Sequence, residues 1–183
     1  MPAAPLEVQN LSAGYGPTQV LDKVSFSVAT GGRLAVLGRN GMGKTTLLAT
    51  LAGQTRHYDG SIRIGTNDVT GLASAARAHS GLGYVPQARC IFPTLTVEEN
   101  LLVGLKNRPK TAIEEAFQMF PRLKERRRNF GNQLSGGEQQ MLSTARSILG
   151  RPAILLLDEP LEGLAPVICE ELMIAFTELP KTG

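Results

Sequence analysis

The chain has 183 residues, enough for one domain with a substantial hydrophobic core. Its hydrophobic content of 42% is ordinary for a globular protein, and no apolar run approaches the roughly 20 residues that cross a bilayer, which argues against a transmembrane helix. Cys90 and Cys169 lie far apart, so the sequence supports neither a disulfide framework nor a zinc site. The amino terminus has no basic leader and no long apolar stretch, and we expect a cytoplasmic protein.

The net charge of +3 comes largely from one run, RLKERRR at residues 122–128. Such a run could meet the phosphates of nucleic acid or lipid, but a solvated helix face is the more frequent explanation. We therefore expect no nucleic-acid partner.

The first half of the chain alternates between strand and helix patterns. Leu6 and Val8, then Val24, Phe26 and Val28, follow the period of two of half-buried strands and predict an antiparallel edge. Residues 33–38, RLAVLG, form a short apolar run typical of a strand buried on both faces of a parallel sheet, and residues 44–51 have helical spacing. The order is strand, glycine-rich loop, helix.

The second half is mostly helical. Two further strands are predicted to end at Ile64 and Val85, and helical patterns begin after Pro93, where Thr96 and Glu99 form a candidate capping box. The chain then returns to a buried strand from Ala153, followed by a helix. We predict an α/β core with an antiparallel β edge and an inserted helical subdomain at about residues 88–142; the last helix is expected to begin near Pro166.

The loop GRNGMGKTT carries the strongest chemical signal. Gly38-x-x-x-x-Gly43-Lys44-Thr45 matches a phosphate-binding loop and stands between a predicted strand and a predicted helix, the context that this motif requires. Glycines let several backbone N–H groups converge on one anion, and the helix adds the positive end of its dipole. Lys44 is predicted to reach the β- and γ-phosphates and Thr45 to hold Mg²⁺.

Two acids close the strand ILLLDEP. A nucleoside triphosphate site needs an acid for the metal and a group that orients or deprotonates the attacking water. We predict that Asp158 anchors Mg²⁺ through its water shell and that Glu159 is the general base.

The segment QLSGGEQQ contains a second helix start. Ser135 and Glu138 by themselves indicate only a capping box. Gly136 and Gly137, however, leave the first-turn amides uncovered by side chains, which predicts a second anion site.

The chain resembles the ATP-binding cassette (ABC) ATPase family, because it contains the phosphate loop, LSGGEQQ and LLLDEP in this order. The resemblance covers essentially the whole chain. The resemblance implies a P-loop NTPase core that binds ATP and Mg²⁺. It also implies that Tyr15 stacks on adenine and that Gln87 contacts Mg²⁺ and senses the transporter. The catalytic residues expected are Glu159, Gln87 and Lys44, and the metal ligands are Thr45, Gln87 and Asp158. The nucleotide-binding residues are Tyr15, Gly38, Asn40, Gly41, Gly43, Lys44, Thr45, Thr46, Ser135, Gly136 and Gly137.

The same resemblance implies partners and a location. Two cassettes pack head to tail in this family, so Ser135–Gly137 of one chain would complete the γ-phosphate site of a second ATPase subunit, in a homo- or heterodimer. Transmembrane permease subunits and, indirectly, a periplasmic solute-binding protein would complete the transporter. The chain is then expected at the cytoplasmic face of the bacterial inner membrane.

Three stretches narrow the resemblance to importers of branched-chain amino acids: IFPTLTVEENLLVGL, RLKERR and DEPLEGLAP. The urea and short-amide importers stand next, and Gln87 and Glu162 lean toward them. A cassette that works without a membrane, as in ribosome-bound or DNA-repair ATPases, is an alternative that the absence of a tandem cassette disfavours.

The resemblance fails at the carboxyl end. Family members carry a histidine that contacts the γ-phosphate roughly thirty residues beyond the catalytic glutamate, whereas the only histidines here are His57 and His79. We therefore expect a single nucleotide-binding domain, residues 1–183, truncated at its carboxyl end. A further alternative is a chain that binds nucleotide without efficient hydrolysis.

Overall fold

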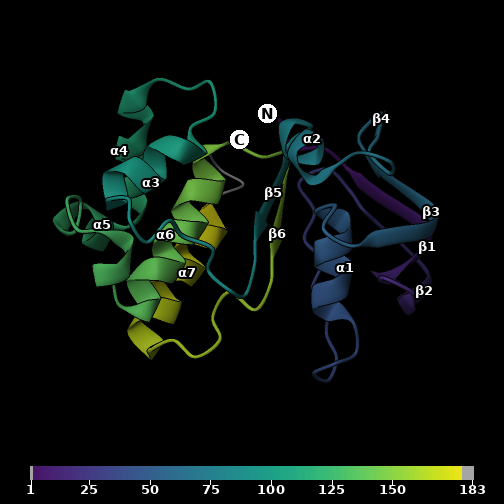
Figure 1. Ribbon diagram of the computed structural model, residues 1–183. Coiled ribbons are helices and arrows are strands. Elements are labelled where there is room, and N and C mark those ends of the chain that lie inside the picture. Colours follow the sequence, from purple (N-terminus) through teal and green to yellow (C-terminus); the bar gives the residue numbers. More distant parts are fainter. Residues whose placement is uncertain (1, 179–183) are drawn as a thin grey trace. The chain divides into compact units, whose positions relative to one another are not determined.

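The computed structural model describes residues 2–178, which divide into two compact units (Figure 1). The first, which we call the sheet unit, contains the residues up to Tyr84 together with Pro152–Asp158. The second, the helical unit, contains Val85–Arg151 and the residues from Glu159 onward. Residues 88–142, where a helical insertion was expected, lie within the helical unit.

An antiparallel sheet forms most of the sheet unit. Val8 on the central strand β1 pairs with Phe26 of β2 on one side and with Ile62 of β3 on the other. The apolar residues predicted to share a face on the first two strands therefore lie on paired strands, and the predicted antiparallel edge is confirmed. The strand order is β2-β1-β3-β4, with bounds β1 Leu6–Tyr15, β2 Thr18–Val28, β3 Arg56–Ile64 and β4 Asn67–Asp68.

Helix α1 packs on this sheet. Leu47 and Leu51 of α1 join the buried cluster that Val8, Leu11 and Ile62 build from the strands. A second sheet contains only two strands, β5 and β6. The bounds are α1 Lys44–Leu51, α2 Ser74–His79, β5 Leu82–Val85 and β6 Ile154–Leu157. The predicted bounds of α1 and the predicted ends of β3 and β5 are confirmed.

The strand expected at residues 33–38 does not form. These residues have no regular secondary structure, and Leu37 is 90% exposed, with Leu34 and Val36 exposed as well. A buried strand needs neighbouring strands that bind its N–H and C=O groups. None of the strands assigned within residues 2–178 pairs with this segment, so its apolar composition alone does not make it a strand.

Arg77, on α2, is a buried cation at the end of α1. Its guanidinium donates to the carbonyls of Thr50 at 2.7 Å and Leu51 at 3.0 Å, where α1 ends, and to those of Thr70 and Leu72. Burial lowers the pKa of Arg77, but an arginine stays charged in proteins. The cation therefore complements the negative end of the α1 dipole and satisfies four backbone carbonyls.

Arg77→Met is expected to lower the free energy of unfolding by about 3–5 kcal/mol, because it leaves buried carbonyls without donors. Urea denaturation of the two proteins measures the difference. Arg63→Met is the matched control, since Arg63 is an exposed arginine of β3 whose guanidinium donates to the Thr66 carbonyl at 3.3 Å. Equal losses for the two variants would contradict this role for Arg77.

The helical unit is built around α6, whose 14 residues begin at the predicted helix start after Ser135. Both predicted capping boxes are present, Thr96 with Glu99 on α3 and Ser135 with Glu138 on α6. The last helix begins at Pro166, as predicted. The helices are α3 Val97–Gly104, α4 Ile113–Met119, α5 Pro121–Glu125, α6 Gly136–Leu149 and α7 Pro166–Glu178, with the 3₁₀ turns η1 Lys110–Ala112 and η2 Gly131–Gln133.

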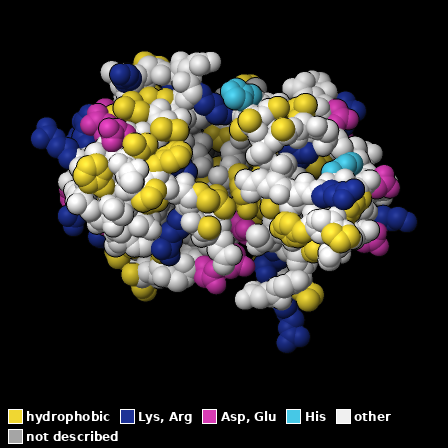
Figure 2. Space-filling model, viewed as in Figure 1, with side chains coloured by type: hydrophobic (Ala, Val, Ile, Leu, Met, Phe, Trp, Pro, Cys, Tyr) yellow, Lys and Arg dark blue, Asp and Glu magenta, His cyan; other side chains and the backbone are white. Residues whose placement is uncertain are grey.

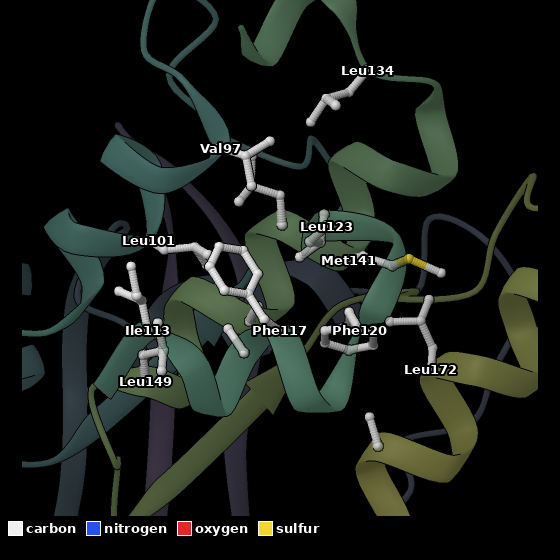
Figure 3. Close-up of a cluster of buried hydrophobic side chains, with 14 of the residues drawn as sticks. Val97, Leu101, Ile113, Phe117, Phe120, Leu123, Leu134, Met141, Leu149 and Leu172 are labelled. Atoms are coloured by element: carbon white, nitrogen blue, oxygen red, sulfur yellow. The ribbon is translucent and has the colours of Figure 1, made fainter. Parts of the chain in front are cut away.

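The helical unit has its own hydrophobic core (Figure 3). Leu101 from α3, Phe117 from α4, Met141 from α6 and Leu172 from α7 converge in it, and all four are 2% exposed or less. Helices α6 and α7 approach each other closely at one point, where a Cβ at Gly137 would lie 3.0 Å from the Ile168 side chain. This close approach fixes the first turn of α6 against α7.

The basic run at residues 122–128 is paired with acids of the helical unit. Arg127 binds the Glu98 carboxylate at 2.6 and 2.8 Å, Arg122 binds Glu171 at 2.9 Å, and Lys124 lies 3.8 Å from Glu114. On the face shown in Figure 2, basic and acidic side chains are interspersed. The run therefore forms local ion pairs, as expected of a solvated helix face.

Candidate nucleotide-binding site

The glycine-rich loop of the sheet unit leads directly into α1. Gly41 and Gly43 have φ angles of 80° and 90°, which only glycine adopts without strain. Gly43 is the N-cap of α1 and no side chain caps this helix. The first amides of α1 are therefore left for an anion, which the positive end of the helix dipole also favours.

The Lys44 side chain forms hydrogen bonds with the backbone of the glycine-rich loop. Its Nζ donates to the carbonyls of Gly38 at 3.0 Å and Arg39 at 3.2 Å. Thr46, the other residue predicted from this motif, is buried in the first turn of α1, and Asn40 is exposed in the loop. The ammonium group thus lies against the backbone of the loop that is predicted to surround a phosphate.

Thr45 and Asp158 come from the two separate segments of the sheet unit's sequence and lie close together. The Thr45 hydroxyl donates to Oδ1 of Asp158 at 3.1 Å, and Asp158, which follows β6, is 2% exposed. Hydroxyl and carboxylate oxygens suit Mg²⁺, which keeps several waters and is shared with substrate phosphates. Among the described residues, no group of three or more His, Cys, Asp or Glu side chains is placed to hold a metal ion.

Tyr84 is a site residue that sequence reasoning missed. Its hydroxyl donates to the second oxygen, Oδ2, of Asp158 at 3.4 Å. The one signal in the sequence was a hydroxyl-bearing aromatic within the otherwise apolar strand GLGYV. Each oxygen of the Asp158 carboxylate therefore accepts from a hydroxyl, Oδ1 from Thr45 and Oδ2 from Tyr84.

Tyr15 lies at the end of β1, in the tight turn that joins β1 to β2, and is 50% exposed. Tyr58 of β3 supports this turn by donating to the carbonyl of Gly16 at 2.7 Å. The Arg56 guanidinium lies 5.7 Å from the centre of the Tyr58 ring. An exposed aromatic ring on a supported turn can offer a stacking surface, and nothing in the local sequence pointed to Tyr58.

The remaining predicted residues belong to the helical unit. Gln87 donates from Nε2 to the Glu162 carboxylate at 2.5 Å, so these two residues are brought together. Glu159 follows Asp158 in the left-handed region, with φ of 47°, a conformation rare for a residue other than glycine. Backbone conformations of this kind cluster at functional sites.

The start of α6 has the side-chain cap predicted from Ser135 and Glu138. The Ser135 hydroxyl accepts the Glu138 N–H at 3.3 Å, and the Glu138 carboxylate accepts the Ser135 N–H at 2.8 Å. The cap therefore uses neither the Gly136 nor the Gly137 amide. The predicted capping box is confirmed, and the Arg89 guanidinium lies beside Gly136, where a Cβ would come within 2.6 Å of it. The anion site at Gly136 and Gly137 stays a prediction.

Comparison with known proteins decides the family, since the profile described as ABC transporter matches residues 21–162. The chain belongs to the ABC transporter family. It is therefore an ATPase subunit of the kind that uses ATP, pairs with transmembrane permeases and dimerises. None of the helices described within residues 2–178 is long and apolar enough to cross a membrane.

Two kinds of transporter ATPase are similar to the chain. It is 39% identical over 182 residues to the high-affinity branched-chain amino acid transport ATP-binding protein BraG of Pseudomonas aeruginosa, covering 97% of this chain and 78% of that protein. It is 35% identical over 184 residues to the lipopolysaccharide export system ATP-binding protein LptB of Haemophilus influenzae, covering 97% and 76%. Sequence likeness to the family therefore leaves the solute open.

Solved structures agree with the fold. An ATP-binding cassette of an ABC transporter in its ADP conformation matches with a TM-score of 0.79 and 26% identity, covering 98% of this chain and 78% of that one. A dimeric bacterial ABC transporter cassette matches in fold with a TM-score of 0.85 over 97% of this chain and 83% of that one. The predicted α/β, P-loop NTPase fold class is confirmed.

Proposed function

We propose that this ABC ATPase subunit powers the import of branched-chain amino acids, and that the predicted residues form its MgATP site. The observation that carries the site assignment is the 3.1 Å hydrogen bond between Thr45 and Asp158, beside the uncapped start of α1. We also propose that the chain is one nucleotide-binding domain with residues 88–142 as its helical insertion.

The sheet unit supplies most of the contacts to one nucleotide in this proposal. The amides from Gly38 to Thr46 surround the β- and γ-phosphates, Lys44 neutralises them and Tyr15 stacks on the adenine. Thr45 and Asp158 hold Mg²⁺, which when bound offsets phosphate charge and aligns the oxygens for attack.

Glu159 and Gln87 are the hydrolytic and sensing groups in this proposal. Glu159 removes a proton from the attacking water, and Gln87 reports the state of the site to the transmembrane subunits. The start of α6, Ser135–Gly137, binds the γ-phosphate of ATP held by a second cassette, in a homo- or heterodimer. This arrangement would make hydrolysis depend on dimerisation.

Two relatives support the choice of solute. BraG and the probable branched-chain amino acid transport ATP-binding protein LivF of Archaeoglobus fulgidus, which is 34% identical over 169 residues, both carry branched-chain amino acid transport in their names. In this proposal, permease subunits anchor the chain at the cytoplasmic face of the inner membrane, and a periplasmic protein delivers the solute. Lipopolysaccharide export is the second candidate, favoured by the 35% identity to LptB.

Metal removal tests the site. The purified protein is expected to release phosphate from ATP with excess Mg²⁺, and EDTA should lower the rate to the background because the phosphate charge and the Thr45–Asp158 pair are then left without the ion. Restoring Mg²⁺ should restore the rate. A rise in melting temperature with MgATP but no phosphate release would instead support nucleotide binding without efficient hydrolysis.

Transport measurements test the solute. Proteoliposomes that contain the protein with its own transmembrane subunits and binding protein should hydrolyse ATP faster with leucine, isoleucine or valine than without them. Urea, acetamide and lipopolysaccharide serve as the competing solutes. Stimulation by one of these, with no response to branched-chain amino acids, would contradict the proposed solute and leave the ATPase assignment intact.

A further inference from the structure

The start of α6 contains a negative charge where the proposed function needs a phosphate. The Glu138 carboxylate accepts the Ser135 N–H at 2.8 Å, and its side chain is only 15% exposed. A carboxylate in the first turn stabilises a helix, but it repels a second anion at the same helix end. The capping box and the phosphate therefore compete for one helix terminus.

Arg126 reduces this conflict. It lies at the C-cap of α5, and its Nε is 3.3 Å from Oε1 of Glu138, the oxygen that does not bind Ser135. Its own N–H donates to Arg122 and its carbonyl accepts from Asn129 at 2.8 Å, so the backbone of Arg126 is fixed. The two oxygens of Glu138 are thus divided between the helix cap and a cation.

The protonation of Glu138 agrees with this geometry. Burial raises its pKa, but the hydrogen bonds from Ser135 and the Arg126 charge outweigh burial, and the pKa lies below its ordinary value. The carboxylate is therefore ionised at neutral pH. Its charge has to be neutralised by a neighbour rather than by a proton.

Three other cations of the basic run are paired with other acids. Arg122 pairs with Glu171, Lys124 with Glu114, and Arg127 with Glu98. Within residues 2–178, Arg126 is the cation paired with Glu138. Glu114 also lies 3.6 Å from Arg127, so Lys124 and Arg127 share an acid. Among the ion pairs of the described residues, Arg126–Glu138 and Arg122–Glu171 share no acid with another cation, so the effect of removing either arginine is separable from the others.

We propose that Arg126 is a positioning residue for the phosphate-binding start of α6. By neutralising Glu138 and holding it on the Ser135 N–H, Arg126 keeps the Ser135 hydroxyl in place and lets a γ-phosphate approach the Gly136 and Gly137 amides. This inference rests on the proposed function of Ser135–Gly137.

Arg126→Gln is expected to raise the KM for MgATP about two- to fivefold, the range that an exposed ion pair supports, with kcat close to that of the parent. The phosphate would then meet an unneutralised carboxylate. The increase should shrink as KCl is raised from 50 to 500 mM, because salt screens repulsion between exposed charges. ATPase rates are measured at one protein concentration throughout, since dimerisation depends on it.

The decisive test is to make Arg126→Gln in a protein that already has Glu138→Gln. A glutamine oxygen can still accept the Ser135 N–H, so the capping box is retained without its charge. In that background, Arg126→Gln should leave the KM unchanged, because there is no carboxylate to neutralise. An equal increase in both backgrounds would overturn the proposal.

Arg122→Gln is the matched control. It removes the same charge from the same run, and Arg122 also contacts its acid through Nε, but that acid, Glu171, lies on α7. Melting temperatures should fall similarly for the two single variants, whereas only Arg126→Gln should raise the KM. Similar KM values for the two would show a general effect of charge and would overturn the role of Arg126.

The failure of this inference is distinguishable from failure of the proposed function. If the parent protein neither binds MgATP nor releases phosphate, the proposed function fails. If the parent hydrolyses MgATP and the Arg126 and Glu138 substitutions are additive, only the positioning role fails.

Discussion

Glu159→Gln is expected to lower the rate of phosphate release about 10²- to 10⁴-fold while the protein still binds MgATP, because a general base contributes to the chemical step. Glutamine has the same shape as glutamate but does not accept a proton at neutral pH. The protein should therefore accumulate with ATP bound, as a closed dimer. Single-turnover hydrolysis and size-exclusion chromatography with MgATP measure the two effects.

Glu162→Gln is the control for this prediction. Glu162 is the next acid along the chain and accepts a hydrogen bond from Gln87, which a glutamine oxygen can also accept. The rate of phosphate release should fall much less in the Glu162→Gln protein than in the Glu159→Gln protein. Normal turnover by the Glu159 variant, or a larger loss at Glu162, would remove Glu159 from the role of base.

Lys44→Ala should weaken MgATP binding about 10- to 100-fold and abolish measurable hydrolysis. Hydrogen bonds to charged groups contribute about 1.5–3 kcal/mol each, and the Lys44 ammonium lies against the Gly38 and Arg39 carbonyls of the loop. Alanine removes the charge and leaves the α1 amides in place. Equilibrium binding of a fluorescent ATP analogue, with and without Mg²⁺, measures the change in affinity.

Arg39→Ala is matched to this variant, because it removes one positive charge from the same loop at an exposed side chain. Its effect on affinity should be within a fewfold. Unchanged MgATP affinity in the Lys44 variant would contradict the assignment of the loop as the phosphate site, whatever the control shows.

Local signals in the sequence were sufficient for much of the fold. Thr96 and Ser135 as N-caps, the helix beginning at Lys44 and the helix beginning at Pro166 are all confirmed. Each depends on interactions within a few residues, such as a side chain that accepts the N–H three residues on. A single sequence contains that information directly.

Residues 33–38 illustrate where such reasoning ends. Their apolar run predicted a buried strand, but a strand also needs neighbours, and the exposed Leu37 lies outside any sheet in the described residues. Arg77 presents the opposite case, since a charged residue in a short helix gave no sign that it would be buried at the end of α1. The type of a residue indicates whether it tends to be buried, but it does not identify the groups that the residue contacts in the folded protein.

The sequence by itself determined the chemistry: a glycine-rich loop with Lys44 and Thr45, two acids after an apolar run, and a glycine-rich start to α6. Only the tertiary structure decided which groups meet. Thr45 and Asp158 lie 113 residues apart in the sequence and 3.1 Å apart in space, with Tyr84 on the other carboxylate oxygen. Hydrogen bonds of this kind depend on how strands and helices pack, and residue types alone do not encode those distances.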